Sequence, residues 1–326
     1  MKKILIIRFS SIGDIVLTTP VIRCLKTQVP DSEIHYLTKK QNQSLLQDNP
    51  YLTKTWLYDK NFEALLPLLK AEKFDFIVDL HKNLRSFYIL LQLRKHYGTF
   101  KKLNLKKWLV VNLKIDWLPR IHIVDRYFEA VKVLGVNNDM KGLDYFIPSE
   151  EVIDKDVFPE AFRQGFIAFV IGGKHSTKIL PDDKVVEICK KAKSLVILLG
   201  GKEDAERGNR IVQSTGSSVF NSCGKFSINQ SASVVQMAEK VITNDTGLMH
   251  IAAAFGKTII SVWGNTIPAF GMYPYLQGKE GISSIFEVQG LSCRPCSKIG
   301  FEKCPKGHFR CMLDQDMNGM LKILNS

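Results

Sequence analysis

The sequence has no apolar run long enough to cross a membrane, since every such run falls far below the ~20 residues of a spanning helix. The first run, residues 4–7, is interrupted by Arg8 and followed by no small-residue cleavage site, which argues against a secretory signal peptide. We therefore expect a cytoplasmic protein. Its 45% hydrophobic and 24% charged content is that of a globular chain, and 326 residues suffice for about two domains.

Two nucleotide-binding signatures are also missing. No G-x-G-x-x-G follows the first predicted strand, which weakens the case for a dehydrogenase. No G-x-x-x-x-G-K-[ST] occurs, so the chain carries no Walker A loop. The sequence holds no short repeat, no low-complexity tract and no recognisable nucleic-acid-binding module.

The whole chain has a formal net charge of +13, and acidic residues are scarcest in its N-terminal half. Residues 1–145 hold 24 Lys and Arg against 14 Asp and Glu, whereas residues 146–326 hold 21 against 18. Residues 80–115 contain nine basic residues and no acid, with Trp108 and Trp117 in or near this run. The run indicates either an acceptor rich in phosphate or carboxylate at an anionic membrane surface, or a solvated basic face.

Cysteine is rare outside one short stretch. Four of the seven cysteines, Cys293, Cys296, Cys304 and Cys311, lie within nineteen residues, with His308 among them. Stable disulfides are not expected in a reducing cytosol. Three interpretations are open: a structural zinc site, although the spacing is not that of a zinc ribbon, free buried thiols, or redox-active pairs.

What the sequence does contain is an alternation of strand and helix patterns, which is typical of parallel α/β sheets. The strands predicted in the first half are residues 3–7, 33–37, 54–57 and 76–78, and the helices are 15–28, 41–47, 62–71, 84–97 and 124–134. After a linker candidate at 144–165, the predicted strands are 166–171, 195–199, 218–220, 241–243 and 258–262, and the helices are 182–193, 204–213, 228–239 and 248–255. The pattern predicts two doubly wound domains, residues 1–155 and 156–326, with a cleft between them.

The first strand-to-helix turn reads Phe9-Ser10-Ser11-Ile12-Gly13-Asp14. Such turns lie at the carboxyl edge of the sheet, where α/β proteins bind ligands. A carboxylate at a helix N-terminus is kept ionised by the helix dipole, which suits a general base. Asp14 therefore has two interpretations, a helix cap or a catalytic base. A second turn of this half, residues 79–86, follows another predicted strand with a cluster of polar and basic residues.

Polar turns also follow the first two strands predicted in the second half. Residues 172–178 combine two glycines, hydroxyl groups and two lysines, as a diphosphate cradle does. Residues 200–204 repeat this design, and their acids, Glu203 and Asp204, suit either ribose hydroxyls or the first turn of a helix.

A third turn, residues 244–250, follows a strand and opens a helix. Backbone N–H groups at Thr246 and Gly247 would bind an anion there, and Asp245 suits sugar hydroxyls better than a phosphate. His250 lies one turn into the helix. An ordinary capped helix with a buried histidine is the other interpretation.

Taken in order, these motifs resemble glycosyltransferase family 9, the ADP-heptose:lipopolysaccharide heptosyltransferases. The resemblance rests on residues 10–14 with Pro20, on 174–181, on 244–250 and on the cysteine pattern of 293–311. One departure is Ile179-Leu180 before Pro181, where many members have an aromatic residue.

The resemblance implies a GT-B fold of two Rossmann-like domains, an N-terminal one for the acceptor and a C-terminal one for the nucleotide sugar. It implies inverting transfer of heptose from ADP-heptose to an anionic glycolipid, an inner-core lipopolysaccharide acceptor of lipid A–Kdo type. No cofactor is required for this catalysis and no nucleic acid is expected as a partner. The enzyme would be peripheral to the inner face of the cytoplasmic membrane.

By motif, the resemblance implies that Asp14 is the general base and that Lys178 neutralises the donor diphosphate. It also implies donor contacts by Asp245, Thr246, Gly247 and His250. The other residues assigned to the donor with them are Thr177, Gly201, Glu203 and Leu248. The acceptor contacts assigned with it are Ser10, Ser11, Gly13, His81, Asn83 and Arg85.

Three other functions fit parts of the pattern. They are another GT-B transferase or epimerase acting on a UDP-sugar, a basic nucleic-acid-binding protein with a structural zinc, and a nucleotide-sugar-binding protein without turnover. Selective stabilisation by UDP or GDP would favour the first, and tight salt-dependent binding to DNA or RNA the second.

Overall fold

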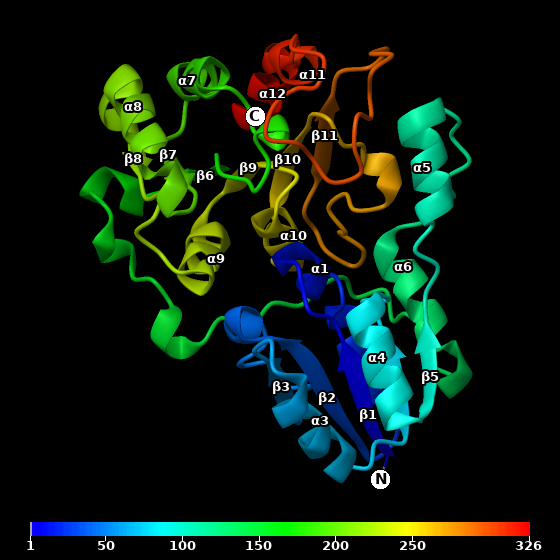
Figure 1. The fold of residues 1–326 in the computed structure, drawn as a ribbon. Helices are drawn as coiled ribbons and strands as arrows, with labels where there is room; N and C mark the ends of the chain where they lie inside the picture. The colour runs from blue at the N-terminus through cyan, green and yellow to red at the C-terminus, as the bar shows by residue number, and fades with distance from the viewer. Residues whose placement is uncertain (1) are drawn as a thin grey trace. The chain divides into compact units, whose positions relative to one another are not determined.

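The structure, a computed structural model that describes residues 2–326, consists of two compact units, each built on one parallel sheet (Figure 1). The first unit comprises Met1–Lys102 and Ile121–Pro148, and the second comprises Leu103–Arg120 and Ser149–Ser326. The chain therefore contributes residues 103–120 to the second unit before it completes the first. The predicted α/β class is confirmed, and the domain boundary at residue 155 stays a prediction.

The first unit has a sheet in the order β3-β2-β1-β4-β5, and all neighbouring strands are parallel. Its strands are β1 (Lys2–Ile7), β2 (Ser32–Lys39), β3 (Lys54–Tyr58), β4 (Phe76–Asp79) and β5 (His96–Thr99). Its helices are α1 (Ile12–Val16), α2 (Thr19–Gln28), α3 (Phe62–Ala71), α4 (Leu84–Leu93) and α6 (Ile123–Tyr127), together with the 3-10 segment Lys40–Leu45.

Both faces of β1 are buried. Leu5 and Ile7 pack in one cluster with Leu69 of α3 and Ile89 of α4. Ile6, on the opposite face, is also fully buried. Because crossover helices cover both faces of a parallel sheet, β1 reads as a continuous apolar run instead of an alternating one.

The helix predicted over 15–28 is wrong in its extent, because the chain forms α1 and then α2. Asp14 consequently lies inside α1, and Ser11 occupies the N-cap position. Pro20 explains the break: it sits in the first turn of α2, where its missing N–H is not needed, whereas in a continuous helix it would remove a hydrogen bond.

Three other predicted helices of this unit are shorter than expected. The helix predicted over 84–97 ends at Leu93, since Arg94 adopts a left-handed conformation (φ 49°), and residues 96–99 form β5 beside β4. The helix predicted over 124–134 is α6 followed by two short 3-10 turns. The segment predicted over 41–47 is the 3-10 segment.

The second unit has a six-stranded parallel sheet in the order β11-β10-β9-β6-β7-β8. Its strands are β6 (Ile167–Val170), β7 (Val196–Leu199), β8 (Val219–Asn221), β9 (Lys240–Asn244), β10 (Thr258–Trp263) and β11 (Ser283–Glu287). Its helices are α5 (Asn104–Leu113), α7 (Asp182–Lys191), α8 (Ala205–Thr215), α9 (Ile228–Met237), α10 (Gly247–Ala254), α11 (Arg310–Leu313) and α12 (Met317–Leu324). The sequence patterns did not predict α5, β11, α11 or α12.

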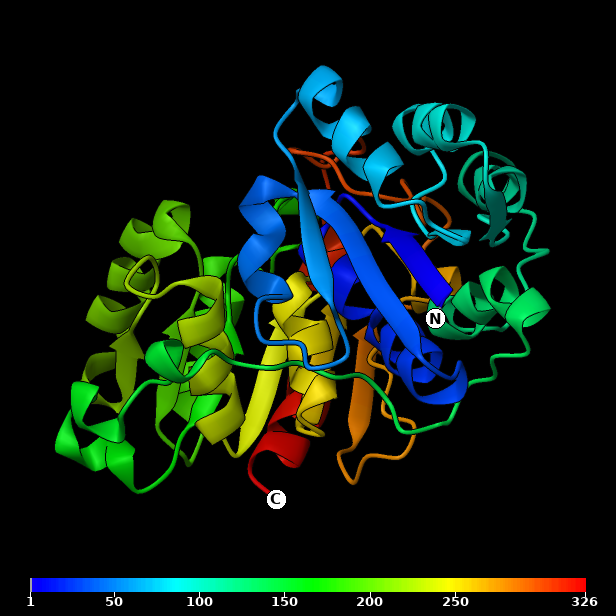
Figure 2. The ribbon, with the colours of Figure 1, turned by 90° about the horizontal axis from the view of Figure 1, so that it is seen from below.

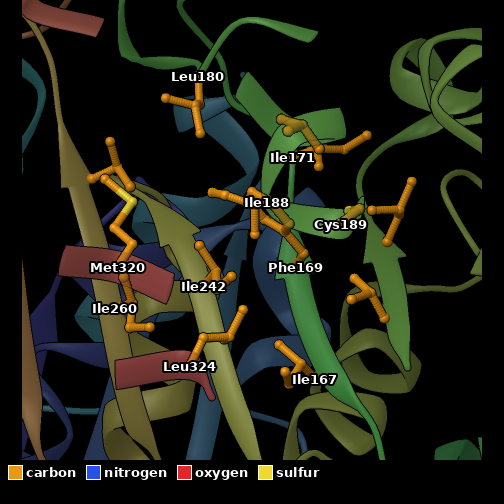
Figure 3. Packing of buried hydrophobic residues seen from close by; sticks show 14 of the residues in the cluster. Ile167, Phe169, Ile171, Leu180, Ile188, Cys189, Ile242, Ile260, Met320 and Leu324 are labelled. Atoms are coloured by element: carbon orange, nitrogen blue, oxygen red, sulfur yellow. The ribbon is translucent and has the colours of Figure 1, made fainter. Parts of the chain in front are cut away.

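The core of the second unit lies between its sheet and the flanking helices. Figure 3 shows Met320 and Leu324 of α12 beside Ile242 of β9, with Ile188 of α7 next to Phe169 of β6. Helices α7 and α12 cover this face of the sheet, whereas α9 and α10 lie on the other face (Figures 1 and 2). None of the helices in the described part of the chain is both long and apolar enough to span a membrane.

Candidate active site

Asp14 is held by an arginine at the carboxyl end of β1. Arg8 Nη2 lies 2.6 Å from Asp14 Oδ1. The other carboxylate oxygen, Oδ2, accepts hydrogen bonds from the backbone N–H of Ser11 (3.0 Å) and from its hydroxyl (2.9 Å). Asp14 thus both caps the first turn of α1 and forms an ion pair, so the two interpretations of this residue are compatible.

The environment keeps Asp14 ionised. Burial alone would raise the pKa of this carboxyl, but the Arg8 guanidinium and the two Ser11 donors outweigh it, so the pKa lies below the ordinary value of 3.8. Arg8 is itself 7% exposed, and its Nε donates to Ser10 O at 2.9 Å while Nη1 donates to Leu80 O. These carbonyls fix the guanidinium, which in turn fixes the carboxylate.

His81 follows β4 and stacks edge-on against Phe9, with ring centroids 5.1 Å apart. Burial, and then the Arg8 charge, lowers its pKa to about 3, so the imidazole is neutral near pH 7. Its Nδ1 is buried without a hydrogen-bond partner among residues 2–326. The structure therefore places a neutral imidazole against the Phe9 ring, with one ring nitrogen unpaired among the described residues.

The remaining acceptor residues predicted in the first unit differ in their surroundings. Asn83 caps α4, since its side chain accepts from Ser86 N at 3.0 Å. Arg85 is exposed and Gly13 is buried. Ser10 and Ser11 lie in the turn beside Asp14, as described above. Contact of any of them with an acceptor stays a prediction.

A second polar cluster lies in the second unit, where the turns after β6, β9 and β10 meet. Lys178 Nζ lies 2.5 Å from Asp245 Oδ2, and the Thr266 hydroxyl donates to the same oxygen at 3.0 Å. Both side chains of the ion pair are partly accessible, at 16% and 14% exposed. Lys178 and Asp245, predicted from separate motifs, are thus brought together.

The N-terminus of α10 lies directly beyond Asp245. Thr246 occupies the N-cap position, yet its side chain does not cap the helix. Its hydroxyl lies 3.2 Å from that of Thr243 instead. Gly247 begins the helix, Leu248 is 9% exposed and His250 is 2% exposed. The first N–H groups of this helix, where the helix dipole is positive, therefore lie beside the Lys178–Asp245 pair, and their contact with a phosphate stays a prediction.

The loop that carries Lys178 is fixed at both ends by Arg207 of α8. Its Nη1 donates to Ile171 O at 2.7 Å and its Nη2 to Leu180 O at 2.5 Å. Its Nε lies 2.5 Å from Asp182 Oδ1. Asn244, buried at the end of β9, accepts from Leu180 N at 3.2 Å. The loop is therefore held in place without any contribution from a ligand.

The buried Asp204 side chain packs against the glycine turns at Gly172 and Gly200. A Cβ added to Gly172 would lie 2.2 Å from Asp204 Oδ2, so only glycine fits there. The same oxygen accepts from Gly201 N at 2.9 Å. Glu203, predicted for ribose, is exposed beside this turn. The sequence left both Glu203 and Asp204 open between contact with ribose hydroxyls and the first turn of a helix. Of these two acids, Asp204 has the structural role.

The cysteine-rich stretch closes over the same loop. The hydroxyl of Thr177 donates to Phe301 O at 2.9 Å and accepts from Phe301 N at 2.8 Å. Arg294 Nη2 donates to Thr266 O at 2.8 Å, and its Nε donates to Gly264 O. The Thr177 hydroxyl thus hydrogen-bonds the backbone of Phe301. The predicted contact between Thr177 and the donor stays a prediction.

Comparisons with known proteins identify the family of the chain. The protein-family model that matches residues 63–298 is described as glycosyltransferase family 9 (heptosyltransferase). The chain belongs to this family. It is therefore a glycosyltransferase, and the predicted resemblance and enzyme class are confirmed.

Individual relatives agree with this assignment. The glycosyltransferase is 26% identical to lipopolysaccharide heptosyltransferase 1 of Campylobacter coli over 81% of this chain and 84% of that protein. The structure of E. coli ADP-heptose LPS heptosyltransferase II is similar with a TM-score of 0.72 at 20% identity, covering 100% of this chain and 98% of that one. The iron-containing dodecameric glycosyltransferase TibC from enterotoxigenic E. coli is similar with a TM-score of 0.59 at 12% identity, covering 99% and 76%. The predicted GT-B fold is confirmed.

The four clustered cysteines of this glycosyltransferase are free thiols, of which only Cys311 is buried. Cys293 Sγ lies 3.6 Å from His308 Nε2, and Cys296 Sγ donates to Cys293 O at 3.1 Å. Among residues 2–326, no three or more His, Cys, Asp or Glu side chains are arranged to hold a metal ion. The donor atoms as placed do not fit a zinc site.

A cleft of about 430 Å³ lies elsewhere in the second unit, between residues 110–120 and the turns after β10 and β11. None of the predicted donor residues lines it. Its cations already have partners: Arg294 lies 2.6 Å from Glu287, and Lys114 donates to Pro295 O at 2.8 Å. Shape alone therefore does not identify the active site in this glycosyltransferase.

Proposed function

We propose that the protein transfers heptose, with inversion, from ADP-heptose to an inner-core lipopolysaccharide acceptor of the lipid A–Kdo type. The observation that carries the proposal is the Lys178 ammonium on Asp245, beside the uncapped N-terminus of α10. The names of similar proteins, lipopolysaccharide heptosyltransferase 1 and ADP-heptose LPS heptosyltransferase II, support this choice of donor and acceptor.

On the donor side, Lys178 and the N–H groups of Thr246 and Gly247 would bind the diphosphate. They are fixed positive groups aimed at the charge that develops when ADP departs, which is where stabilisation accelerates the reaction. Asp245 orients the Lys178 ammonium and would accept hydrogen bonds from heptose hydroxyls. Further donor contacts are proposed for Thr177, Gly201, Glu203, Leu248 and His250.

On the acceptor side, Asp14 would take the proton of the attacking hydroxyl. The acceptor oxygen forms a bond to the anomeric carbon, the bond from that carbon to the phosphate oxygen breaks, and ADP leaves with the electron pair. The carboxylate suits this task because Arg8 and Ser11 keep it ionised and immobile. Ser10, Ser11, Gly13, His81, Asn83 and Arg85 are proposed to bind the acceptor.

No step of this proposal is assigned to a metal ion or other cofactor. The similarity to TibC, whose name describes it as iron-containing, is one reason to measure metal content nevertheless. Metal well below one ion per purified chain would leave the cysteines as free thiols. The enzyme is further proposed to work in the cytoplasm at the inner face of the membrane, where its glycolipid acceptor would be held, with no nucleic acid partner.

The donor assignment is tested by thermal shift and by titration of ADP, UDP and GDP into the full chain. We expect ADP to raise the melting temperature most. Lys178→Ala should weaken ADP binding about 10- to 100-fold, the value of one charge-assisted hydrogen bond. Lys190→Ala, an exposed lysine on α7, is the matched control and should bind ADP normally. Selective stabilisation by UDP or GDP would contradict the ADP-heptose assignment.

A further inference from the structure

Helix α5 is attached to the second unit by one side only. Val110 packs with Leu118 and with Phe270 of the turn that follows β10. The Lys107 ammonium lies 5.5 Å from the centroid of the Phe270 ring. Figure 1 shows α5 at the periphery of this unit, beside that turn. Val110 is the one buried residue of the helix.

The other side of α5 is apolar and exposed. Leu105 and Trp108 are 71% and 52% exposed, and their spacing places both on one face of the helix. The segment 103–120 carries further exposed apolar residues: Leu113 at 54%, Ile115 at 39% and Trp117 at 65%. Scattered exposed apolar side chains are ordinary, but five large ones within thirteen residues indicate an interaction surface.

The charge around these side chains is positive. Lys106 is exposed next to Leu105 in the sequence, and Lys107 is half-buried. The acid of this segment, Asp116, lies 2.6 Å from Arg120 and is neutralised by it. A partner of this surface must therefore combine an apolar layer with negative charge.

We propose that residues 103–120 insert into the surface of an anionic lipid bilayer. Tryptophan beside lysine suits the boundary between headgroups and acyl chains, where the indole is half-buried and the ammonium meets phosphate. A second copy of the chain fits less well, because it would bring the same basic segment against itself. The inference rests on the proposed function only in that a glycolipid acceptor gives the enzyme a membrane to work on.

The surface is tested by cosedimentation of the full chain with vesicles of phosphatidylcholine and phosphatidylglycerol, against vesicles of phosphatidylcholine alone. The wild type should bind the anionic vesicles, and added salt should weaken the binding. Tryptophan emission gives a second readout. Trp56 and Trp263 are 8% and 1% exposed, so a blue shift on binding would come from Trp108 and Trp117.

The decisive variant is the double substitution Leu105→Gln and Trp108→Gln, with an expected loss of vesicle affinity of at least about tenfold. Its matched control replaces two apolar residues of the same unit that are equally exposed, Val152 (56%) and Ile282 (64%), by Gln. The control should bind vesicles as the wild type does.

Several outcomes would overturn the inference. They are a wild type that does not bind anionic vesicles, a Leu105/Trp108 variant that binds as well as the wild type, and wild-type self-association that this variant abolishes without any vesicle binding. ADP titration of the same variant separates the two proposals. Normal ADP binding with lost vesicle binding supports the surface, whereas failure of Lys178→Ala to weaken ADP would contradict the donor site alone.

Discussion

Asp14 illustrates how one carboxylate serves two purposes. Its Oδ2 completes the first turn of α1 through Ser11, and its Oδ1 pairs with the buried Arg8. A cap alone would not require an arginine that is itself held by two backbone carbonyls. The carboxylate is held through both of its oxygens and is ionised, as a general base has to be.

We expect Asp14→Asn to lower kcat by about 10²- to 10⁴-fold, the usual contribution of a general base, with ADP affinity retained. Asparagine keeps the shape and still accepts from Ser11, but it cannot take a proton. The measurement is steady-state transfer together with ADP titration. Asp31→Asn is the control, since Asp31 is exposed and its positive φ of 51° suits asparagine. Near-native turnover in Asp14→Asn would remove this residue from the role.

If Asp14 is the general base, we expect Arg8 to set the acid limb of the activity profile through the pKa of Asp14. With Arg8 present that pKa is lowered below 3.8, so the base remains deprotonated at any pH above this value. Replacing Arg8 by Met removes the charge that does most to lower the pKa of Asp14, while burial continues to raise it. The acid limb of the kcat profile should therefore move to higher pH in Arg8→Met and stay low in Arg8→Lys. An unchanged limb in Arg8→Met would contradict the pairing.

Arg207 fixes the conformation of the loop that carries Lys178, although Arg207 itself lies in α8 and outside every motif. It binds the carbonyls at both ends of the loop, Ile171 O and Leu180 O, so the loop begins and ends at one guanidinium. Asn244 provides a further fixed point from β9. Preorganisation of this kind lets the ammonium lie in place before any donor binds.

Removal of Arg207 should loosen this loop and destabilise the second unit. Arg207→Met removes the donor to the two carbonyls and to Asp182 Oδ1, so we expect a loss of about 2–4 kcal/mol in the free energy of unfolding and weaker ADP binding. Urea denaturation and ADP titration measure the two effects. Arg210→Met is the control, because Arg210 is 62% exposed and lies 3.5 Å from the same Asp182. Equal stability of both variants would refute the role assigned to Arg207.

At the scale of the whole molecule, each unit has a core and a charge network of its own. In the first unit, Arg23 of α2 binds Asp139 through two contacts of 2.8 Å and also pairs with Asp144. This network fastens the last segment of the unit, residues 139–144, to α2. The hydrogen bond from Arg23 lowers the pKa of Asp139 from 3.8 to about 2.

Because the pKa of Asp139 is lowered in the folded state, the stability of this unit depends on pH in the acid range. The contribution of Asp139 is present in full above the unfolded pKa of 3.8 and is lost as pH falls towards about 2. Asp139→Asn should therefore lower the free energy of unfolding by about 2 kcal/mol near pH 7, and by much less at about pH 2. Urea denaturation at both pH values checks this, with the exposed Asp48→Asn as control. A constant difference between the two pH values would contradict the assignment.

The sequence by itself determined the parallel α/β class and most strands, because buried strands of parallel sheets are continuous apolar runs such as residues 167–170. It also determined the family, since short turns such as 10–14 and 244–250 follow strands in a specific order. Element ends were less predictable: Pro20 divides a helix whose apolar spacing is continuous, and Arg94 ends another by adopting a positive φ.

Only the tertiary structure decided which side chains meet. Lys178 and Asp245 are 67 residues apart, and no local pattern shows that they pair or that Thr266 joins them. Arg207, Arg294 and Thr177 bind backbone carbonyls, whose positions depend on how the whole chain folds. Helix α5 was missed for a related reason: its apolar residues are divided between a buried and an exposed side, so its sequence lacks the single apolar stripe of a surface helix.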